Sequence, residues 1–537
     1  MSDEKPLNRI LTLAAPAASA LLLTLAMPGL TGWWPLLFVA LLPLLWAARQ
    51  LSPSQSVCMG MACGILYHAG LMYWIVFVLN HYGGMHAAVA AAAMLLLAAY
   101  MAGYMGFFCW AISRLTGGPG QGSASVILLT APALWVGLDV VKGFLFSGLP
   151  WMDLGCGLHR QPLLIQSADL GGHHLVTFCV VQINALIFWL ADRMLNRSRA
   201  KELRRHSLYP LAVFLLLYCV GGYSMFRWRQ IEATAASAGQ AVVTVVQGNI
   251  DQSEKWSPAH KEETVRKYLA LSKRNFRSDR PMDLLVWPET ALPFYPSRDT
   301  LMHQVRGFAR DRRVHMLVGA PYFTVLPEKK RPVEFFNSAL MLDSDGRLTE
   351  RYNKQHLVPF GEYVPLRDYL WFVKPLVELI GDFIPGTSSD PMEAEQIKAG
   401  TLICFESIFP EIARKTVAQG ANLLVNLTND AWYGRSSAPH QSWAMTVMRA
   451  VENRRSVARA ANTGISGFVA PTGAVIAESA LFEDAALTES VPLLTEQTFF
   501  VKGGHWFGHV CLALSGIFLL INSWLTRKQR KRGGGKR

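Results

Sequence analysis

LICFESIFPE, residues 402–411, places a cysteine directly after a short apolar run, with a carboxylate two residues further on. An apolar run that ends in reactive side chains is typical of a buried strand that delivers them to one edge of a sheet. Of the eight cysteines, Cys404 alone lies in a long region of mixed polarity. Cys156 lies in a short linking segment, and the other six lie in strongly apolar runs, at positions 58, 63, 109, 179, 219 and 511. We therefore look for chemistry around Cys404.

The composition indicates a membrane protein with a soluble part. The 537 residues are 51% hydrophobic and 17% charged, whereas soluble proteins carry about 25% charged residues. The net charge of +13 could suggest a nucleic-acid partner. The basic residues cluster at the ends of apolar runs, however, so membrane orientation explains them better. We predict no binding of nucleic acid.

Eight apolar segments are candidates for transmembrane helices, which need about 20 mostly apolar residues. The first contains Pro16 and lacks a clear cleavage site, so it is not predicted to be a cleaved signal peptide. The eight segments cover residues 10–29, 34–48, 57–79, 86–112, 124–146, 174–194, 208–226 and 506–525.

The distribution of Lys and Arg predicts the orientation. With a cytoplasmic N-terminus, the inner segments hold most of the basic residues, including six between positions 193 and 205 and seven from 527 onward. The outer connections hold only Arg160, with Lys142 near the end of its helix. We therefore expect a seven-helix membrane domain (1–229), an outer domain (230–500), and an eighth helix with a basic cytoplasmic tail (501–537). This arrangement is polytopic, with both chain ends in the cytoplasm.

The outer loop FSGLPWMDLG, residues 146–155, contains Trp151 between turn-forming residues. Such a tryptophan is usually an anchor at the membrane interface, and we prefer that interpretation to a substrate contact. Asp139 and Lys142, near the end of the fifth segment, are the best candidates for functional charges within the membrane. They also fit an interfacial ion pair.

Residues 240–500 alternate between apolar, strand-like runs and polar helical stretches. Several runs are continuously apolar, as expected for strands covered on both faces. We predict one α/β domain with two packed sheets. The strand candidates are 241–250, 283–289, 314–322, 336–343, 401–406 and 422–430, and the helix candidates are 258–278, 297–312 and 439–460.

An insertion, PLRDYLWFVKPLVELIGDFIPG (365–386), gathers many large apolar side chains in a short span. A soluble domain would bury such a cluster as core. Beside a bilayer, it could instead form a lid that dips into lipid, and we prefer the lid.

Three segments of the outer domain carry candidate catalytic groups. LLVWPET places Glu289 at a strand end, RYNKQHLVPFGEYVP contains Lys354 and Glu362, and LICFE places Cys404 at another strand end. A carboxylate can accept the thiol proton, and an ammonium group can stabilise a developing oxyanion. These groups together could attack a carbonyl without histidine or metal. Taken alone, the residues favour ordinary alternatives, namely a solvated salt bridge and an inert buried thiol.

In this order, the three segments resemble the nitrilase superfamily, whose members use a Glu–Lys–Cys triad on an αββα sandwich. With the apolar segments and NLTNDAWYG (426–434), the whole chain resembles the bacterial apolipoprotein N-acyltransferase family. The resemblance implies that Glu289 is the general base, Lys354 the stabiliser of the oxyanion, and Cys404 the nucleophile. It also implies a location in the bacterial inner membrane, with the catalytic domain in the periplasm.

Supporting roles follow from the same resemblance. Glu362 matches a second essential carboxylate, Glu406 an important acid after the nucleophile, and Trp256 a tryptophan linked to substrate handling. Phe405 departs from the pattern, because a tyrosine often follows the nucleophile, so any hydroxyl there is absent or supplied elsewhere. After Asp430, a serine occupies position 442, where a histidine is common, and no role is transferred to His440.

The resemblance implies an acyl transfer in two steps. A fatty acyl chain moves from a phospholipid donor to Cys404 as a thioester, and then to the α-amino group of a diacylglyceryl-cysteine on an apolipoprotein acceptor. The alternatives are a membrane-tethered amidase that uses the same triad, and a transporter with an inert outer domain. No metal-ligand spacing, phosphate loop or dinucleotide motif occurs, so we predict no cofactor. Cys156 is expected to lie out of disulfide reach of Cys404, and a monomer is the default.

Overall fold

The structure is a computed structural model of the chain. It describes residues 6–117, 124–195, 208–253, 255–257, 259–274, 276, 281–328, 332–364 and 383–533. The chain forms two compact units. Unit 1 comprises 1–80, 85–225 and 505–537, and unit 2 comprises 81–84 and 226–504. Most of the proposed lid, residues 365–382, lies outside the described residues.

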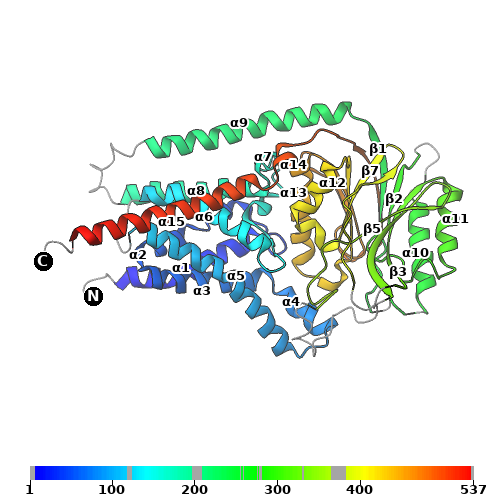
Figure 1. The fold of residues 1–537 in the computed structure, drawn as a ribbon, viewed down its shortest axis with the longest axis horizontal. Helices are drawn as coiled ribbons and strands as arrows, with labels where there is room; N and C mark the ends of the chain where they lie inside the picture. Colours follow the sequence, from blue (N-terminus) through cyan, green and yellow to red (C-terminus); the bar gives the residue numbers. More distant parts are fainter. Residues whose placement is uncertain are drawn as a thin grey trace. The chain divides into compact units, whose positions relative to one another are not determined.

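Unit 1 is helical (Figure 1). Its long helices pack through small side chains: in α3, Gly60 and Gly64 approach the backbone of α5 so closely that a Cβ atom would clash. The helices are α1 (Pro6–Ala26), α2 (Leu42–Gln50), α3 (Pro53–Leu71), α4 (Trp74–Phe77), α5 (Ala87–Leu115), α6 (Ala124–Phe144), α7 (Ala168–Gly171), α8 (His173–Leu195), α9 (Leu208–Ser237), whose residues from 226 onward belong to unit 2, and α15 (Trp506–Gly533). Short turns add η1 (Trp34–Phe38), η2 (Val78–Tyr82), η3 (Leu154–Leu158) and η4 (Pro162–Leu164).

Among the described residues, five helices are long and apolar enough to cross a membrane, or six if a bent pair counts as one span. The five are α5, α6, α8, α9 and α15, and the bent pair joins α3 to the segment Trp74–Tyr82 at an angle of 55°. The expectation of eight is therefore met only in part. Two apolar stretches fall below the length of a full span: Ile10–Ala26, within the 21-residue α1, and Trp34–Gln50, where a turn separates η1 from the nine-residue α2.

Buried charges gather at one end of α6 in unit 1. The Lys142 ammonium donates to Asp139 Oδ1 at 2.8 Å and also to Asp153, and Asp153 Oδ2 lies 2.9 Å from His173 Nε2. The expected pair of Asp139 and Lys142 is thus part of a larger buried cluster. Trp151, expected as an interfacial anchor, is instead only 3% exposed in unit 1, and its ring lies 5.1 Å from that of Trp74.

Unit 2 contains two six-stranded sheets. The first sheet has the order β12-β1-β2-β3-β4-β5 and the second the order β11-β10-β9-β8-β7-β6. Its strands are β1 (Gln240–Gln247), β2 (Leu284–Val286), β3 (His315–Val325), β4 (Val333–Leu342), β5 (Leu348–Asn353), β6 (Met392–Ala394), β7 (Ile397–Ile403), β8 (Leu423–Thr428), β9 (Ser456–Ala461), β10 (Gly467–Val469), β11 (Val475–Glu478) and β12 (Ala485–Pro492). Its helices are α10 (Lys261–Arg274), α11 (Met302–Arg312), α12 (Pro410–Ala418), α13 (Ala438–Asn453) and α14 (Phe499–Gly503), with η6 (Cys404–Ile408) and η7 (Asp430–Tyr433) after β7 and β8.

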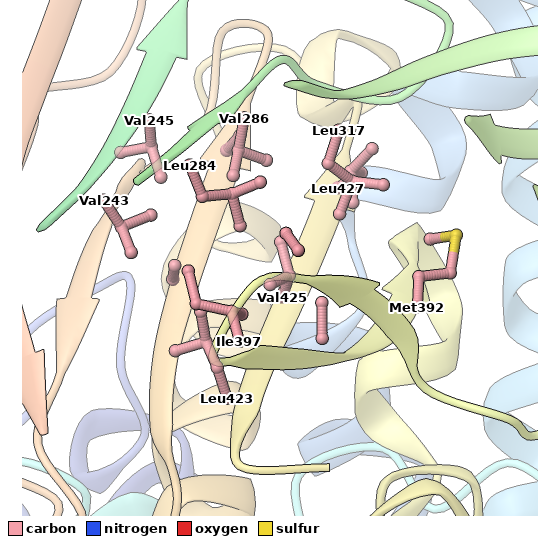
Figure 2. Close-up of a cluster of buried hydrophobic side chains, with 14 of the residues drawn as sticks. Val243, Val245, Leu284, Val286, Leu317, Met392, Ile397, Leu423, Val425 and Leu427 are labelled. Atoms are coloured by element: carbon pink, nitrogen blue, oxygen red, sulfur yellow. The ribbon is translucent and has the colours of Figure 1, made fainter. Parts of the chain in front are cut away.

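Alternate side chains of the strands fill the space between the sheets. Figure 2 shows Val243, Leu284 and Leu317 of the first sheet close to Ile397 and Val425 of the second. Helices α10 and α11 cover the other face of the first sheet (Figure 1). Side chains of that face and of the two helices form one buried apolar cluster. Because helices cover the outer faces, the central strands are buried on both sides, which explains their continuous apolar sequences.

All six predicted strands are present, with shifted ends. The predicted helix 439–460 is wrong in its last turns, because the chain leaves α13 at Asn453 and forms β9. Arg454 makes this break in the left-handed conformation, at φ 51°. All eight cysteines are free thiols, so Cys156 and Cys404 form no disulfide.

Candidate active site

Cys404 lies where β7 ends and η6 begins, and its thiol is buried. Its backbone adopts φ 54°, a left-handed conformation that is unfavourable for a residue with a Cβ atom. Such strain persists only where the surrounding structure holds it, and it concentrates at functional sites. The thiol interacts electrostatically with Glu289, Lys354 and Asp430, so it lies near the charged groups of the site.

Lys354 lies directly after β5, between two carboxylates. Its Nζ is 3.0 Å from Glu362 and 3.5 Å from Glu289 Oε1. Glu289 follows β2, and Glu362 lies in the loop after Lys354. All three side chains are buried. The structure therefore brings together the predicted base, the predicted lysine and the second carboxylate.

Asn337 of β4 joins the two carboxylates. Its Nδ2 donates to Glu289 Oε1 at 2.7 Å and to Glu362 Oε1 at 2.9 Å. Its carbonyl oxygen accepts from the backbone N–H of Lys354 at 2.8 Å. One side chain and its own backbone thus fix the base, the second carboxylate and the lysine. Sequence reasoning did not single out this residue, because one Asn inside an apolar strand resembles many others.

The neighbouring carboxylates raise the pKa of both the lysine and the thiol, whereas burial lowers the first and raises the second. Burial alone would lower the pKa of Lys354, but Glu362 and Glu289 hold it above its usual range, so the ammonium stays charged. Burial raises the pKa of Cys404 to about 12, and the Glu289 and Asp430 charges add to this effect against Lys354. The resting thiol is therefore protonated, and attack on a carbonyl requires a base to remove the proton.

A second polar network lies on the β8–β9 side of Cys404. The Thr428 hydroxyl interacts with the Cys404 thiol and donates to Asp430 Oδ1 at 2.8 Å. Asp430 Oδ2 pairs with the fully buried Arg459 at 2.9 Å, and Arg459 also donates to Ser442 at 3.0 Å. Position 442, where a histidine was expected, thus supports Arg459. An arginine inside the apolar run of β9 was the signal that could have revealed this network.

Glu406 connects the two sheets behind the nucleophile. It accepts backbone N–H donors from Ile403 at 2.7 Å, Gln355 at 2.5 Å and His356 at 3.2 Å, and the Tyr352 hydroxyl at 2.9 Å. Burial raises its pKa to about 7, against the effect of these donors. Glu406 thereby joins the turn at Cys404 to the segment that follows Lys354. It lies next to the reacting groups, and its contacts are those of a structural residue.

The remaining predicted residues are aromatic, and they contact other aromatic or apolar side chains. Trp256 packs in a small apolar cluster around Leu357 and Phe383. Phe405 contacts the ring of Phe409, with centroids 5.2 Å apart, and supplies no hydroxyl. Trp151 belongs to unit 1, whereas the candidate triad belongs to unit 2.

Among the described residues, one group has the geometry to hold a metal ion, and it lies in unit 1. It consists of Asp153, His173 and His174, where Asp153 is already bonded to Lys142 and His173. The candidate active site of unit 2 is built from Glu, Lys, Asn and Cys side chains, a set suited to acid–base and nucleophilic chemistry.

The two sheets, their outer helices and this arrangement fit the fold of the carbon-nitrogen hydrolases. Residues 242–498 match the family described as carbon-nitrogen hydrolase. A solved structure of yeast Nit3, a member of the nitrilase superfamily, covers 47% of this chain and 90% of its own, at 17% identity and a TM-score of 0.37.

Residues 19–186 match the family described as apolipoprotein N-acyltransferase N-terminal domain. The apolipoprotein N-acyltransferase of Geobacter metallireducens is 37% identical over 93% of both chains. The enzyme of the same name from Methylococcus capsulatus is 32% identical over 87% of this chain and 88% of its own. The chain belongs to the apolipoprotein N-acyltransferase family, which confirms the resemblance found in the sequence.

Replacing Asn337 tests its place between the carboxylates. Asn337→Leu removes both donated hydrogen bonds, each to a charged group and worth about 1.5–3 kcal/mol. We expect acylation of Cys404 to slow by roughly 10- to 100-fold, measured as a single-turnover rate with phospholipid. Asn422→Leu is the matched control, because Asn422 bonds only to the backbone of Gln396 and Lys398. An unchanged rate in Asn337→Leu would remove this residue from the site.

The protonated state of Cys404 can be read from its alkylation. Only the thiolate reacts with iodoacetamide. Because the pKa of Cys404 is raised, its thiolate fraction should still increase about tenfold per pH unit in the pH range where an ordinary thiol ionises. The alkylation rate of Cys404, followed by peptide mass analysis, should therefore still rise between pH 8 and 10. The same cysteine in urea-unfolded protein should level off near pH 9. A plateau below pH 8 in folded protein would indicate a preformed thiolate instead.

Proposed function

We propose that this acyltransferase moves a fatty acyl chain from a phospholipid to the α-amino group of a diacylglyceryl-cysteine at the N-terminus of an apolipoprotein, through a thioester on Cys404. The observation that carries the proposal is the buried Glu289–Lys354–Glu362 group beside the buried thiol of Cys404. Relatives that align over nearly the whole chain bear the name of this activity.

In the first step, Glu289 accepts the thiol proton while the sulfur of Cys404 attacks the ester carbonyl carbon. The carbonyl oxygen gains negative charge, and the Lys354 ammonium stabilises it. The C–O bond of the ester then breaks, and the leaving alkoxide takes the proton from Glu289. Lysophospholipid departs, and the acyl chain remains on sulfur as a thioester.

In the second step, the free amine of the acceptor attacks the thioester carbonyl. Glu289 accepts a proton from the amine, the C–S bond breaks, and the Cys404 sulfur regains its proton. The products are an amide-linked, triacylated lipoprotein and free enzyme. Donor and acceptor use the same nucleophile in turn, so ping-pong kinetics are expected.

A trapped intermediate tests this scheme. Incubation of the protein with dipalmitoyl phosphatidylethanolamine should add one palmitoyl group to the peptide that contains Cys404, measured by mass spectrometry. A diacylglyceryl-cysteine peptide should then remove the adduct and gain the acyl chain in equal amount. Cys404→Ser should lose the thioester and the transfer, whereas Cys156→Ser should keep both. Normal transfer by Cys404→Ser would end the proposal, and hydrolysis of small amides without an adduct would favour an amidase.

We also propose that the chain crosses the bacterial inner membrane eight times, with α1 and residues 34–50 as spans and residues 226–504 in the periplasm. Two observations support this: both segments are apolar, and the basic residues lie at alternate ends of the helices. The termini would then be cytoplasmic.

Fusions of alkaline phosphatase, which is active only in the periplasm, test the number of crossings. A fusion after Thr31 should be active and one after Leu51 inactive, because residues 34–50 lie between them. Equal activity at the two positions would mean that this segment does not cross.

A further inference from the structure

Unit 2 contains a second fully buried lysine, Lys255, which is absent from the proposed mechanism. Its Nζ donates to the Thr290 hydroxyl at 2.8 Å and to the main-chain carbonyl oxygen of Glu289 at 3.2 Å. Among the described residues, no carboxylate lies within 4.0 Å of this ammonium group. Lys255 therefore binds the backbone of the proposed base rather than an acid.

Such a lysine is unfavourable for stability. An amine that is buried without a charge partner loses its hydration and gains only neutral hydrogen bonds. Burial accordingly lowers the pKa of Lys255 to about 8, against the opposing charge of Glu289. Buried titratable groups that are poorly compensated concentrate at functional sites, so the contacts of Lys255 indicate what it does.

The turn at Glu289 and Thr290, which Lys255 contacts, sets the direction of the Glu289 side chain. Thr290 adopts φ 46°, which is strained for a β-branched residue. On its other side the turn packs on Gly319 of β3, where a Cβ atom would lie 2.7 Å from the Glu289 Cα. The backbone of Glu289 is thus held between β3 and the ammonium of Lys255. From this position the carboxylate reaches Lys354 and Asn337.

Lys255 also belongs to the loop that carries Trp256. The two residues are adjacent, and Trp256 packs in the apolar cluster with Leu357 and Phe383. Gln252 of the same loop accepts from Asn429, after β8, at 2.6 Å. The contact with the base and the packing of Trp256 are thus made by adjacent residues of one loop.

We propose that Lys255 is a positioning residue, which aligns Glu289 through its main chain and makes that alignment depend on the loop that bears Trp256. This inference rests on the proposed role of Glu289 as the base. Lys255 does not touch the reacting atoms.

Lys255→Met removes the donors and keeps a side chain of similar length. Replacing a buried, unpaired ammonium by an apolar group should leave the melting temperature unchanged or higher. A misaligned base should slow single-turnover acylation of Cys404 by about 10- to 100-fold. Lys398→Met, at an exposed lysine paired with Glu393, is the matched control and should keep the wild-type rate and melting temperature. A lower melting temperature with a wild-type rate constant would mean that Lys255 is only structural, and would overturn the proposal.

Variants of Thr290 test whether Lys255 acts on Glu289 through its hydrogen bond to the Thr290 hydroxyl. Thr290→Val removes the hydroxyl that accepts from Lys255, whereas Thr290→Ser keeps it, so Val should slow acylation and Ser should not. In the double variant Lys255→Met/Thr290→Val, the two losses of acylation rate should be less than additive. The reason is that each single variant already removes the hydrogen bond between Lys255 and Thr290. Fully additive losses would overturn the proposed path.

A readout without lipid separates this inference from the proposed function. Alkylation of Cys404 by iodoacetamide follows its thiolate fraction, which the nearby Glu289 charge lowers. If Glu289 is displaced in Lys255→Met, alkylation should therefore be faster than in wild type at pH 7.5. If wild type forms no acyl-enzyme but alkylation still depends on Lys255, the proposed function fails and the positioning role stands. If wild type acylates and Lys255→Met matches it in both assays, the positioning role fails alone.

Discussion

The ammonium group of Lys354, buried between two carboxylates, is the interaction on which the rest of the site depends. Without it, Glu289 and Glu362 would be two like charges bound to the same amide of Asn337. Removing one partner of such a buried group usually costs about 3–5 kcal/mol, because the remaining charges lose their compensation. The lysine also lies where a positive charge can stabilise a developing oxyanion.

The candidate site combines the two sheets of unit 2. Glu289, Asn337 and Lys354 come from the first sheet, and Cys404 comes from the second. Glu406 and Tyr352 form a hydrogen bond between the sheets beside these groups. Relative movement of the sheets would therefore separate the thiol from its base, and the apolar core between them resists that movement (Figure 2).

The site contains strained backbone and buried polar groups, which lower the stability of the fold and must be offset by contacts elsewhere. Cys404 and Thr290 have strained backbones, and Lys255, Lys354, Glu289 and Glu406 are buried polar groups. Neighbouring residues hold these features in place. Gly319 leaves room for the turn at Glu289, and Arg459 pairs with Asp430, whose charge acts on Cys404. A protonated thiol with a carboxylate base suits a reaction in which the nucleophile is formed only when substrate is present.

The sequence by itself determined the membrane character, the α/β class of the outer domain, and the positions of Glu289 and Cys404 at the ends of two strands. Apolar run length and reactive side chains at strand ends are local properties, which the sequence displays directly. Only the tertiary structure decided how the chemistry is held: Asn337, Thr428, Arg459 and Lys255 act through partners far away in the chain. It also showed that α13 ends where β9 begins, that turns interrupt the second apolar segment, and that Trp151 is buried. Hydrogen-bond geometry, burial and strand pairing depend on contacts between distant residues, and no local pattern records those contacts.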